Sequence, residues 1–347
     1  IIKKYDNDKS INKILITSST LSSSNILKKI KFKKTIHQFY PIDHLFFSNK
    51  FLNYWKPDIA IFLESEIWPS MFKSIKNRNI PLILLNARIT KKTYNRWFKI
   101  KKFSNSIFNL IDKAYSQNSE TNYYLKKLNV KSIKSIGNLK FIENDNFESN
   151  RTDKKLFSQF KRYKTFIAAS THDTEELFTA KTHILLKKKN KNIITIIIPR
   201  HVNRVNQIIS QINELGLNVI SRSSNKRKLK NIDIFVVDTF GESKKFYKFA
   251  TTVFLGGSII KRGGQNPLEA ARFGTKILHG PNIDNFKDVY KYLNQLKISS
   301  KVNSPQECAN SIIFKKNMKK AKKMKYLGTT ILKKTLNELD KSIHNEI

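Results

Sequence analysis

Cysteine, glycine and acidic side chains are all scarce in this 347-residue sequence. Its one cysteine, Cys308, excludes an internal disulfide and a cysteine-rich metal site, and it fits a reducing compartment. No apolar run reaches the roughly 18 residues that span a bilayer, and no signal peptide is visible. The chain begins with Ile1 instead of Met, so we expect that a segment precedes it.

Acidic residues are few, because 26 Asp and Glu stand against 66 Lys and Arg, a formal net charge of +40. Nucleic acid is the first partner that such a charge suggests. The lysines are scattered in short pairs, however, and the abundance of Lys, Ile and Asn is typical of an A/T-rich genome. We therefore expect no nucleic-acid partner. The basic surface favours an anionic membrane, at about 1 kcal/mol for each nearby Lys.

Apolar runs alternate with helical patterns along most of the chain. Strands are predicted in the first half at 13–19, 58–64, 81–87, 113–117 and 131–138, and helices at 22–30, 68–79 and 119–129. In the second half, strands are predicted at 165–170 and 192–200 and in LNVISRS, DIFVVDT, TTVFLGG and TKILHG, with helices at 172–189 and 201–216. This alternation predicts parallel sheets covered by helices on both faces.

A polar stretch after residue 142 breaks the alternation and predicts a linker between two domains. The predicted parts are an N-terminal Rossmann-like domain at 1–145, the linker at 146–162, a C-terminal Rossmann-like domain at 163–325, and a C-terminal helix at 326–347 whose helical pattern Gly328 interrupts. The fold class is α/β, with two Rossmann-like domains facing a cleft and ligands at the carboxyl ends of the strands.

Six of the ten glycines fall within one short stretch: Gly256, Gly257, Gly263, Gly264, Gly274 and Gly280. VFLGGS predicts a strand running into a turn, and KRGGQNPLEAARFG a turn running into a helix. The N-terminus of that helix is a candidate phosphate site, and Glu269 in its first turn is placed to bind ribose hydroxyls. Tight packing without a ligand explains the glycines equally well. Asn266 and Glu269, polar at the helix start, favour a nucleotide.

Two further loops follow predicted strands of the second half. The strand in IIIPRH places Arg200 and His201 at its C-terminal end, and an Arg side chain can bind a phosphate through two hydrogen bonds. The alternative interpretation is an exposed charge at a strand end, which has no ligand. VVDTFGES places Phe240, Gly241 and Glu242 to line a base or sugar pocket, and a plain turn is as good an interpretation of that loop alone. Three such loops in one domain favour a ligand.

Carboxylates and a histidine mark two other turns. FLESEIWPS puts Glu64 and Glu66 on one side of the chain just past a strand, where paired carboxylates can bind hydroxyls or move protons. The alternative is that they complement a helix dipole. In STHDTEE, Ser170 and His172 belong to a helix-capping pattern, in which a histidine is more often structural than catalytic.

Twelve blocks, colinear along the chain, resemble the family of 3-deoxy-D-manno-octulosonic acid (Kdo) transferases of lipopolysaccharide synthesis. They are LITSSTLSSSN, HQFYPIDH, FLESEIWPS, LILLNARIT, SQNSET, IGNLKF, AASTHDTEE, IIPRH, DTFGE, FLGGS, GGQNPLEAA and GPNIDNF. This resemblance implies the glycosyltransferase B fold. It also implies inverting transfer of Kdo from the co-substrate CMP-Kdo to a lipid A precursor (lipid IVA), with no cofactor and no metal at the nucleotide.

The resemblance also assigns residues. It implies CMP contacts at Pro199, Arg200, His201, Phe240, Gly241, Glu242, Gly263, Gly264, Asn266, Pro267, Leu268 and Glu269. It implies catalytic roles for Glu64, Glu66 and Lys140, and adds Ser170 and His172 as further site residues. The sequence departs from the family pattern at Gln265, Ser70 and Phe240, where His, Asn and Met are usual.

The family's general base is a Glu in a segment that would lie upstream of Ile1, near an N-terminal anchor. We therefore expect the chain as given to be inactive, and the whole protein to work at the cytoplasmic face of the bacterial inner membrane. One alternative keeps the fold and changes the reaction to that of a nucleotide-sugar epimerase or another transferase. A second is a nucleic-acid binder, which predicts clustered Lys and Arg with interleaved aromatics, and the sequence does not show them.

Overall fold

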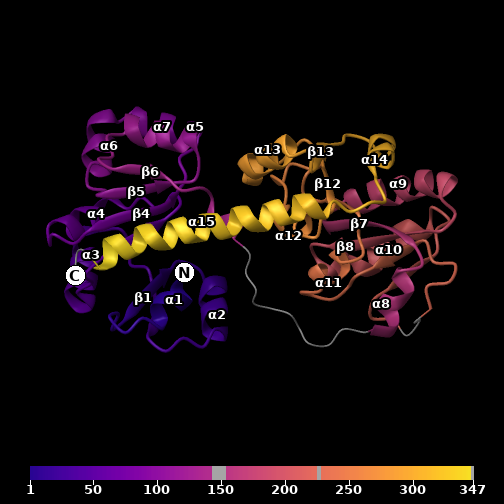
Figure 1. The fold of residues 1–347 in the computed structure, drawn as a ribbon, viewed down its shortest axis with the longest axis horizontal. Coiled ribbons are helices and arrows are strands. Elements are labelled where there is room, and N and C mark those ends of the chain that lie inside the picture. The colour runs from indigo at the N-terminus through magenta and orange to yellow at the C-terminus, as the bar shows by residue number, and fades with distance from the viewer. Residues whose placement is uncertain (143–153, 225–227, 345–347) are drawn as a thin grey trace. The chain divides into compact units, whose positions relative to one another are not determined.

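The structure, a computed structural model, describes residues 1–142, 154–224 and 228–344. It divides into an N-terminal unit, Ile1–Ile142 with Gly328–Ile347, and a C-terminal unit, Glu143–Leu327. Every strand pair in both units is parallel, so the α/β fold class is confirmed (Figure 1).

The N-terminal unit contains a two-stranded and a four-stranded sheet. The first pairs β1 (Ile14–Ser18) with β2 (Thr35–Phe39). The second has the order β3-β4-β5-β6, with β3 (Ala60–Leu63), β4 (Leu82–Ala87), β5 (Lys113–Ser116) and β6 (Ile133–Ser135). β4 is buried at all six positions, which its apolar composition requires. The sequence patterns did not predict β2.

Helices enclose this larger sheet. Met71, Phe72, Ile107, Phe108 and Leu125 from three of them form one apolar core with the strands. The helices of the unit are α1 (Ile2–Asp6), α2 (Leu21–Lys29), α3 (Leu45–Trp55), α4 (Pro69–Lys76), α5 (Lys91–Phe98), α6 (Lys101–Phe108), α7 (Ser119–Lys127) and the 3-10 turn η1 (Leu139–Phe141).

The C-terminal unit is built on one seven-stranded sheet with the order β13-β12-β11-β7-β8-β10-β9. Its strands are β7 (Lys164–Thr171), β8 (Ile193–Pro199), β9 (Val219–Ser221), β10 (Ile234–Val236), β11 (Thr252–Leu255), β12 (Lys276–His279) and β13 (Ser299–Lys301). The central strands are runs of buried β-branched and aromatic residues, as expected for a sheet covered on both faces.

Helices cover both faces of this sheet (Figure 1). The elements are α8 (Lys154–Phe160), α9 (Glu175–Lys189), η2 (Val202–Arg204), α10 (Val205–Asn213), α11 (Ser243–Tyr247), α12 (Leu268–Ala271), η3 (Asp284–Phe286), α13 (Lys287–Gln295) and α14 (Pro305–Ser311). The predicted linker lies partly outside the described residues, and its remainder forms α8. There the Phe160 ring packs 5.2 Å from that of Phe235, within the C-terminal unit.

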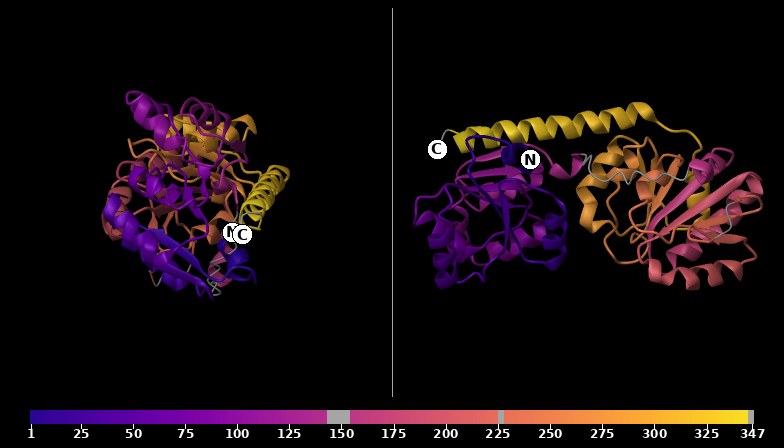
Figure 2. Two further views of the ribbon diagram at one scale, coloured as in Figure 1. Left: turned by 90° about the vertical axis from the view of Figure 1, so that its left-hand side faces the viewer. Right: turned by 90° about the horizontal axis from the view of Figure 1, so that it is seen from below.

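The long helix α15 (Met318–His344) runs without a break, so the predicted interruption at Gly328 is wrong (Figure 2). Gly328 is needed for a different reason. A Cβ at this position would lie 2.4 Å from the carbonyl oxygen of Phe141. The glycine lets backbone pass close to the helix, and this contact outweighs its low helix propensity. Further along α15, Asp340 accepts a hydrogen bond from Tyr5 at 2.9 Å.

Candidate active site

The C-terminal sheet has a topological switch point between β7 and β11. From β7 the chain adds β8, β9 and β10 on one side, and it then places β11 on the other side of β7. In open α/β sheets, ligands bind outside the carboxyl ends of the strands at such a point. The end of β7 with the loop after it, residues 170–174, and the loop after β11, residues 256–259, therefore meet where a ligand is expected.

Close backbone approach explains the glycines at this point. A Cβ on Gly256 would lie 2.4 Å from the carbonyl oxygen of Ser170, and one on Gly280 would lie 2.3 Å from the carbonyl oxygen of Ser258. No side chain fits at either position. Packing thus accounts for these glycines, and the assignment of a nucleotide depends on the side chains around them.

The loops after β8 and β11 bring the basic side chains of Arg200, His201 and Arg262 near His172. Its ring centroid lies 5.6 Å from that of His201. Burial lowers the pKa of His172, and the charges of His201, Arg262 and Arg200 lower it further, against the nearby Glu175. The Nε2 atom of His172 is buried and has no hydrogen-bond partner among the described residues. A neutral imidazole with an unpaired nitrogen, beside cationic side chains, suits an anionic ligand.

The predicted residues Phe240, Gly241 and Glu242 form a turn after β10. Phe240 is 79% exposed, and Gly241 has a φ of +77°. Burial raises the pKa of Glu242, but hydrogen bonds from Thr239 and Lys245, at 2.5 and 3.0 Å, bring it below its usual value. The turn is therefore held by its own carboxylate and presents the Phe240 ring to solvent.

Within the glycine-rich stretch, Gly263 and Gly264 come before the helix that was predicted as a phosphate site. Their φ values are +82° and +74°. Asn266 Oδ1 then accepts a hydrogen bond from the N–H of Leu268 at 3.0 Å. The helix α12 that follows has only four residues, so its dipole is weaker than that of the longer helix predicted from PLEAARFG. Pro267 and Leu268 are buried, Glu269 is half-buried, and Asn266 is exposed.

Two of the three predicted catalytic residues meet at the carboxyl edge of the N-terminal unit's larger sheet. Glu64 directly follows β3, and Lys140 lies in η1 after β6. Lys140 Nζ lies 3.3 Å from Glu64 Oε1, and their side chains are 32% and 38% exposed. Glu64 has a φ of +55°, a conformation that costs about 1–3 kcal/mol for a non-glycine residue and is often found at functional sites.

Glu66 has a different partner, because Trp68 Nε1 donates to its Oε2 at 2.8 Å. The Trp68 ring lies 5.1 Å from that of Tyr40. Asp43 accepts a hydrogen bond from the N–H of Met71 at 2.9 Å and so caps α4. Tyr40 and Asp43 thus support the turn that carries Glu64 and Glu66. Sequence reasoning assigned them no role, although both stand in the HQFYPIDH block.

A chain of buried amides supports the segment that carries Lys140. Asn138 Nδ2 donates to Gln117 Oε1 at 2.9 Å, and Gln117 Nε2 donates to the carbonyl of Asn86 at 2.8 Å. The side chain of Asn86 accepts from the N–H of Leu139 at 3.0 Å, and that of Asn138 from the N–H of Lys140 at 2.9 Å. Three strand ends are thereby joined. Their blocks LILLNARIT, SQNSET and IGNLKF were the signal, but spacing does not show that their amides meet.

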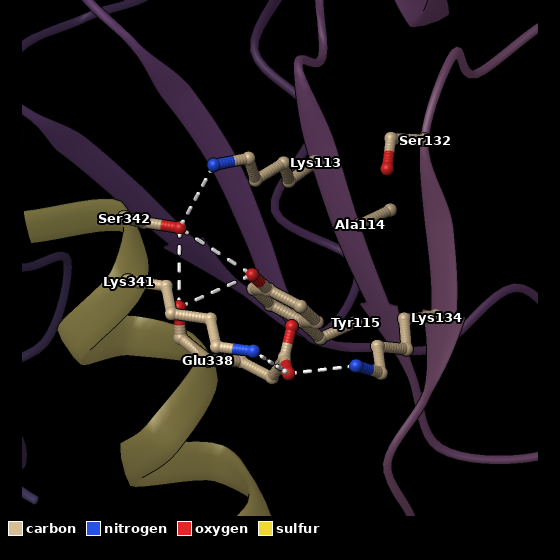
Figure 3. A pocket seen from close by; sticks show the side chains of 8 residues that line it. All are labelled: Lys113, Ala114, Tyr115, Ser132, Lys134, Glu338, Lys341 and Ser342. Carbon is tan, nitrogen blue, oxygen red and sulfur yellow. Dashed lines mark hydrogen bonds and ion pairs between the residues drawn. The ribbon is translucent and has the colours of Figure 1, made fainter. Parts of the chain in front are cut away.

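A cavity of about 390 Å³ lies elsewhere in the N-terminal unit, between β5, β6 and α15 (Figure 3). Its polar side chains bond mostly to one another: Lys134 Nζ lies 2.7 Å from Glu338 Oε1, and Lys113 Nζ donates to Ser342 Oγ at 3.3 Å. These contacts dock α15 on the sheet. None of the predicted site residues lines this cavity.

Comparison with known proteins identifies the family. Residues 1–143 match the family described as 3-deoxy-D-manno-octulosonic-acid transferase (kdotransferase). The 3-deoxy-D-manno-octulosonic acid transferase of Rickettsia prowazekii is 32% identical over 321 residues, which are 92% of this chain and 69% of that protein. The chain belongs to the Kdo transferase family. It is therefore a glycosyltransferase.

Solved structures agree with this family in fold. A glycosyltransferase from Rickettsia africae superposes with a TM-score of 0.57 at 16% identity, covering 95% of this chain and 90% of that one. UDP-GlcNAc 2-epimerase from Neisseria meningitidis gives 0.58 at 13% identity, covering 97% and 94%. The fold is therefore of the kind found in glycosyltransferases and in sugar-nucleotide epimerases. The sequence relatives, and not the fold, distinguish the Kdo transferase family from the epimerases.

Proposed function

We propose that the full-length protein transfers Kdo from CMP-Kdo to a lipid A precursor, lipid IVA, with inversion at the anomeric carbon. The observation that carries the donor half is the unpaired Nε2 of His172 at the switch point of the C-terminal unit, near Arg200 and Arg262. CMP-Kdo brings a phosphate and a carboxylate, and both suit such a site.

The CMP group is assigned to the loops of the C-terminal unit. Arg200 and His172 face the phosphate in this proposal, Phe240 the base, and Glu269 the ribose hydroxyls. The reaction uses CMP-Kdo as a co-substrate and no cofactor. Negative charge builds on the phosphate as CMP leaves, and fixed cationic groups stabilise that charge best because they need no reorganisation during the reaction.

The acceptor is assigned to the carboxyl edge of the N-terminal unit's larger sheet. A hydroxyl of the glucosamine disaccharide attacks the anomeric carbon of Kdo, and a carboxylate removes its proton. Lys140, held at 3.3 Å from Glu64, places a positive charge at this edge of the sheet. Glu64 in turn fixes the position of that ammonium group.

An anionic membrane is the proposed surface on which the acceptor is met. All six residues of FKIKKF (98–103), at the junction of α5 and α6, are exposed. Phe98, Ile100 and Phe103 are 48%, 50% and 43% exposed, and lysines alternate with them. Apolar rings beside ammonium groups suit the interface of anionic lipids. Separately, no helix within the described ranges has both the length and the apolar composition to cross a bilayer. The proposed location is the cytoplasmic face of the inner membrane.

Mass spectrometry of lipid IVA incubated with the full-length protein and CMP-Kdo tests this proposal. The expected result is lipid carrying one or more Kdo residues, with an equal amount of CMP released. UDP-GlcNAc serves as the control donor, because its epimerisation would support the alternative reaction. Release of CMP without modified lipid would contradict the acceptor, and conversion of UDP-GlcNAc alone would contradict the transferase.

A further inference from the structure

A fully buried carboxylate joins the two loops at the switch point of the C-terminal unit. We propose that Glu175 is a positioning residue that holds the 256–259 loop in the shape required by the donor site. This inference rests on the proposed function, because it takes that loop to border the CMP-Kdo site. Neither the composition of the STHDTEE block nor the resemblance assigned a role to Glu175.

Both oxygens of Glu175 accept two backbone N–H groups each. Oε2 accepts from His172 at 3.0 Å and from Gly257 at 2.7 Å. Oε1 accepts from Ser258 at 3.0 Å and from Ile259 at 2.9 Å. Three consecutive N–H groups of the 256–259 loop are thus fixed by one side chain. Hydrogen bonds to a charged acceptor are about twice as strong as neutral ones, so this carboxylate determines the path of the loop.

Asn282 also supports this loop, through the carbonyls of Ser258 and Ile259, whereas Glu175 binds its N–H groups. Glu175 is 0% exposed, so water cannot replace it as an acceptor without opening the fold. Gly256 brings the loop so close to Ser170 that a Cβ would lie 2.4 Å from its carbonyl oxygen. The carboxylate occupies the space beside this contact, at 2.7 Å from the same Cβ position.

We call the four hydrogen bonds that Glu175 accepts the clamp. The clamp also affects predicted CMP contacts on either side of the 256–259 loop. The N–H of Gly264 donates to the carbonyl of Gly257 at 2.8 Å, so the turn before Asn266 takes its position from the clamped loop. On the other side, Glu175 fixes the N–H of His172, whose buried Nε2 has no hydrogen-bond partner among the described residues and is assigned to the phosphate in the proposed function. A shift of the clamp would therefore move two parts of the donor site together.

Replacing Glu175 by Gln tests the charge and the second acceptor without changing side-chain length. The Gln side chain has one oxygen and one NH₂ group, and the NH₂ group would face two N–H donors. Glu176→Gln is the matched control. Glu176 is the next residue of α9 and is 1% exposed, but its carboxylate pairs with Arg204, at 3.3 Å, instead of the loop.

Hydrogen exchange read by mass spectrometry measures the clamp directly, without nucleotide. Glu175→Gln should speed exchange in the peptide that covers residues 257–259 by at least about tenfold, while peptides from β8 and α10 stay unchanged. Glu176→Gln should leave the 257–259 peptide as in the wild type. Unchanged exchange there in Glu175→Gln, or equal acceleration in both variants, would overturn the clamp.

Calorimetric titration with CMP then measures the consequence for the donor site. Glu175→Gln should bind CMP at least about tenfold more weakly, and KM for CMP-Kdo should rise more than kcat falls. Glu176→Gln should stay within about threefold of wild-type affinity. Equal weakening in both variants would mean that core damage, and not loop position, is responsible. A wild type that binds no CMP would instead refute the proposed function and leave the exchange result standing.

If the Glu175→Gln variant does not fold, hydrogen exchange in the wild-type protein tests the proposal. The N–H groups of Gly257, Ser258 and Ile259 lie in a loop, yet the clamp predicts that they exchange as slowly as those of β11. Fast exchange of these three groups in the wild type would overturn the proposal.

Discussion

Lys140 Nζ lies 3.3 Å from Glu64 Oε1, although the two residues are 76 positions apart in the sequence (140 − 64). Each follows the carboxyl end of a strand in the N-terminal unit's larger sheet. The pair is partly exposed, so its contribution to stability is about 0–1 kcal/mol. Glu64 has an energetically unfavourable φ, and buried amides support the segment that carries Lys140. The fold thus keeps in place two charges whose mutual attraction adds little to its stability. This combination favours a role in the reaction.

Lys140→Met should therefore reduce Kdo transfer by at least about tenfold while leaving the melting temperature almost unchanged. Lys134→Met is the matched control, because Lys134 pairs with Glu338 at 2.7 Å in the same unit, away from the predicted site. Transfer assays and thermal melts of both variants check this. Equal activity in the two variants would show that the Lys140–Glu64 pair is structural.

Glu269→Gln should weaken CMP binding while shifting the melting temperature little. Glu269 is half-buried in a helix of only four residues, so its interaction with the helix dipole is small. If it accepts two ribose hydroxyls, the loss of its charge should cost about 1.5–3 kcal/mol of binding. Calorimetry and thermal melting measure the two effects separately. A large drop in melting temperature with unchanged CMP affinity would assign Glu269 to packing.

The strand-and-helix alternation was predictable because parallel strands buried on both faces are continuous apolar runs. IITIIIP and LILLNA are examples, and they form β8 and β4 in the structure. β2 and β13 were not predicted. β13 is three residues of sequence SSK, and it depends on pairing with β12. The continuity of α15 through Gly328 was also missed, because the contact that requires the glycine comes from Phe141, almost 190 positions earlier in the sequence.

The sequence blocks that form the candidate site could be predicted, but most contacts between their side chains could not. The pattern FLESEIWPS suggested paired carboxylates, but Glu64 bonds to Lys140 and Glu66 to Trp68. The glycine-rich stretch suggested a ligand, whereas close backbone contacts already require Gly256 and Gly280. Glu175, the carboxylate with four backbone donors, was hidden in a pattern typical of a helix cap. Such contacts depend on tertiary packing, which one-dimensional spacing does not contain.

Binding to anionic vesicles should depend on the FKIKKF segment. Phe98→Ser combined with Phe103→Ser removes two exposed rings and should weaken sedimentation with phosphatidylglycerol vesicles severalfold, because buried apolar area adds to electrostatic attraction at the interface. Ile313→Ser is the control, since Ile313 is 43% exposed, as Phe103 is, but belongs to the C-terminal unit. Equal sedimentation of the double variant and the wild type would contradict this surface.

Stability of the C-terminal unit should fall in mild acid because of His183. Its Nδ1 lies 2.8 Å from Thr195 Oγ1, and its Nε2 lies 3.4 Å from Asp233, which also binds Lys187. Burial lowers the pKa of His183 below its ordinary 6.5, against the opposing effect of Asp233. Below pH 6.5 the unfolded chain therefore binds more protons than the native one, and stability falls until the lowered pKa is reached.

The free energy of unfolding in urea, measured between pH 7.5 and 5.5, checks this expectation. His183 contributes at most about 1.4 kcal/mol per pH unit. His183→Gln should show a shallower decline than the wild type, even if it is less stable at pH 7.5. Parallel declines would show that His183 does not titrate differently in the folded and unfolded chains.

The C-terminal unit should hold the CMP group of the donor, and calorimetric titration of CMP into the wild type and Arg200→Ala measures this. Arg162→Ala is the control, because Arg162 is also exposed in that unit but lies in the turn after α8, outside the predicted loops. We expect saturable binding to the wild type, weakened at least about tenfold by Arg200→Ala, as is usual for a charge-assisted phosphate contact, and unchanged in Arg162→Ala. Absence of CMP binding, or equal affinity in all three proteins, would contradict it.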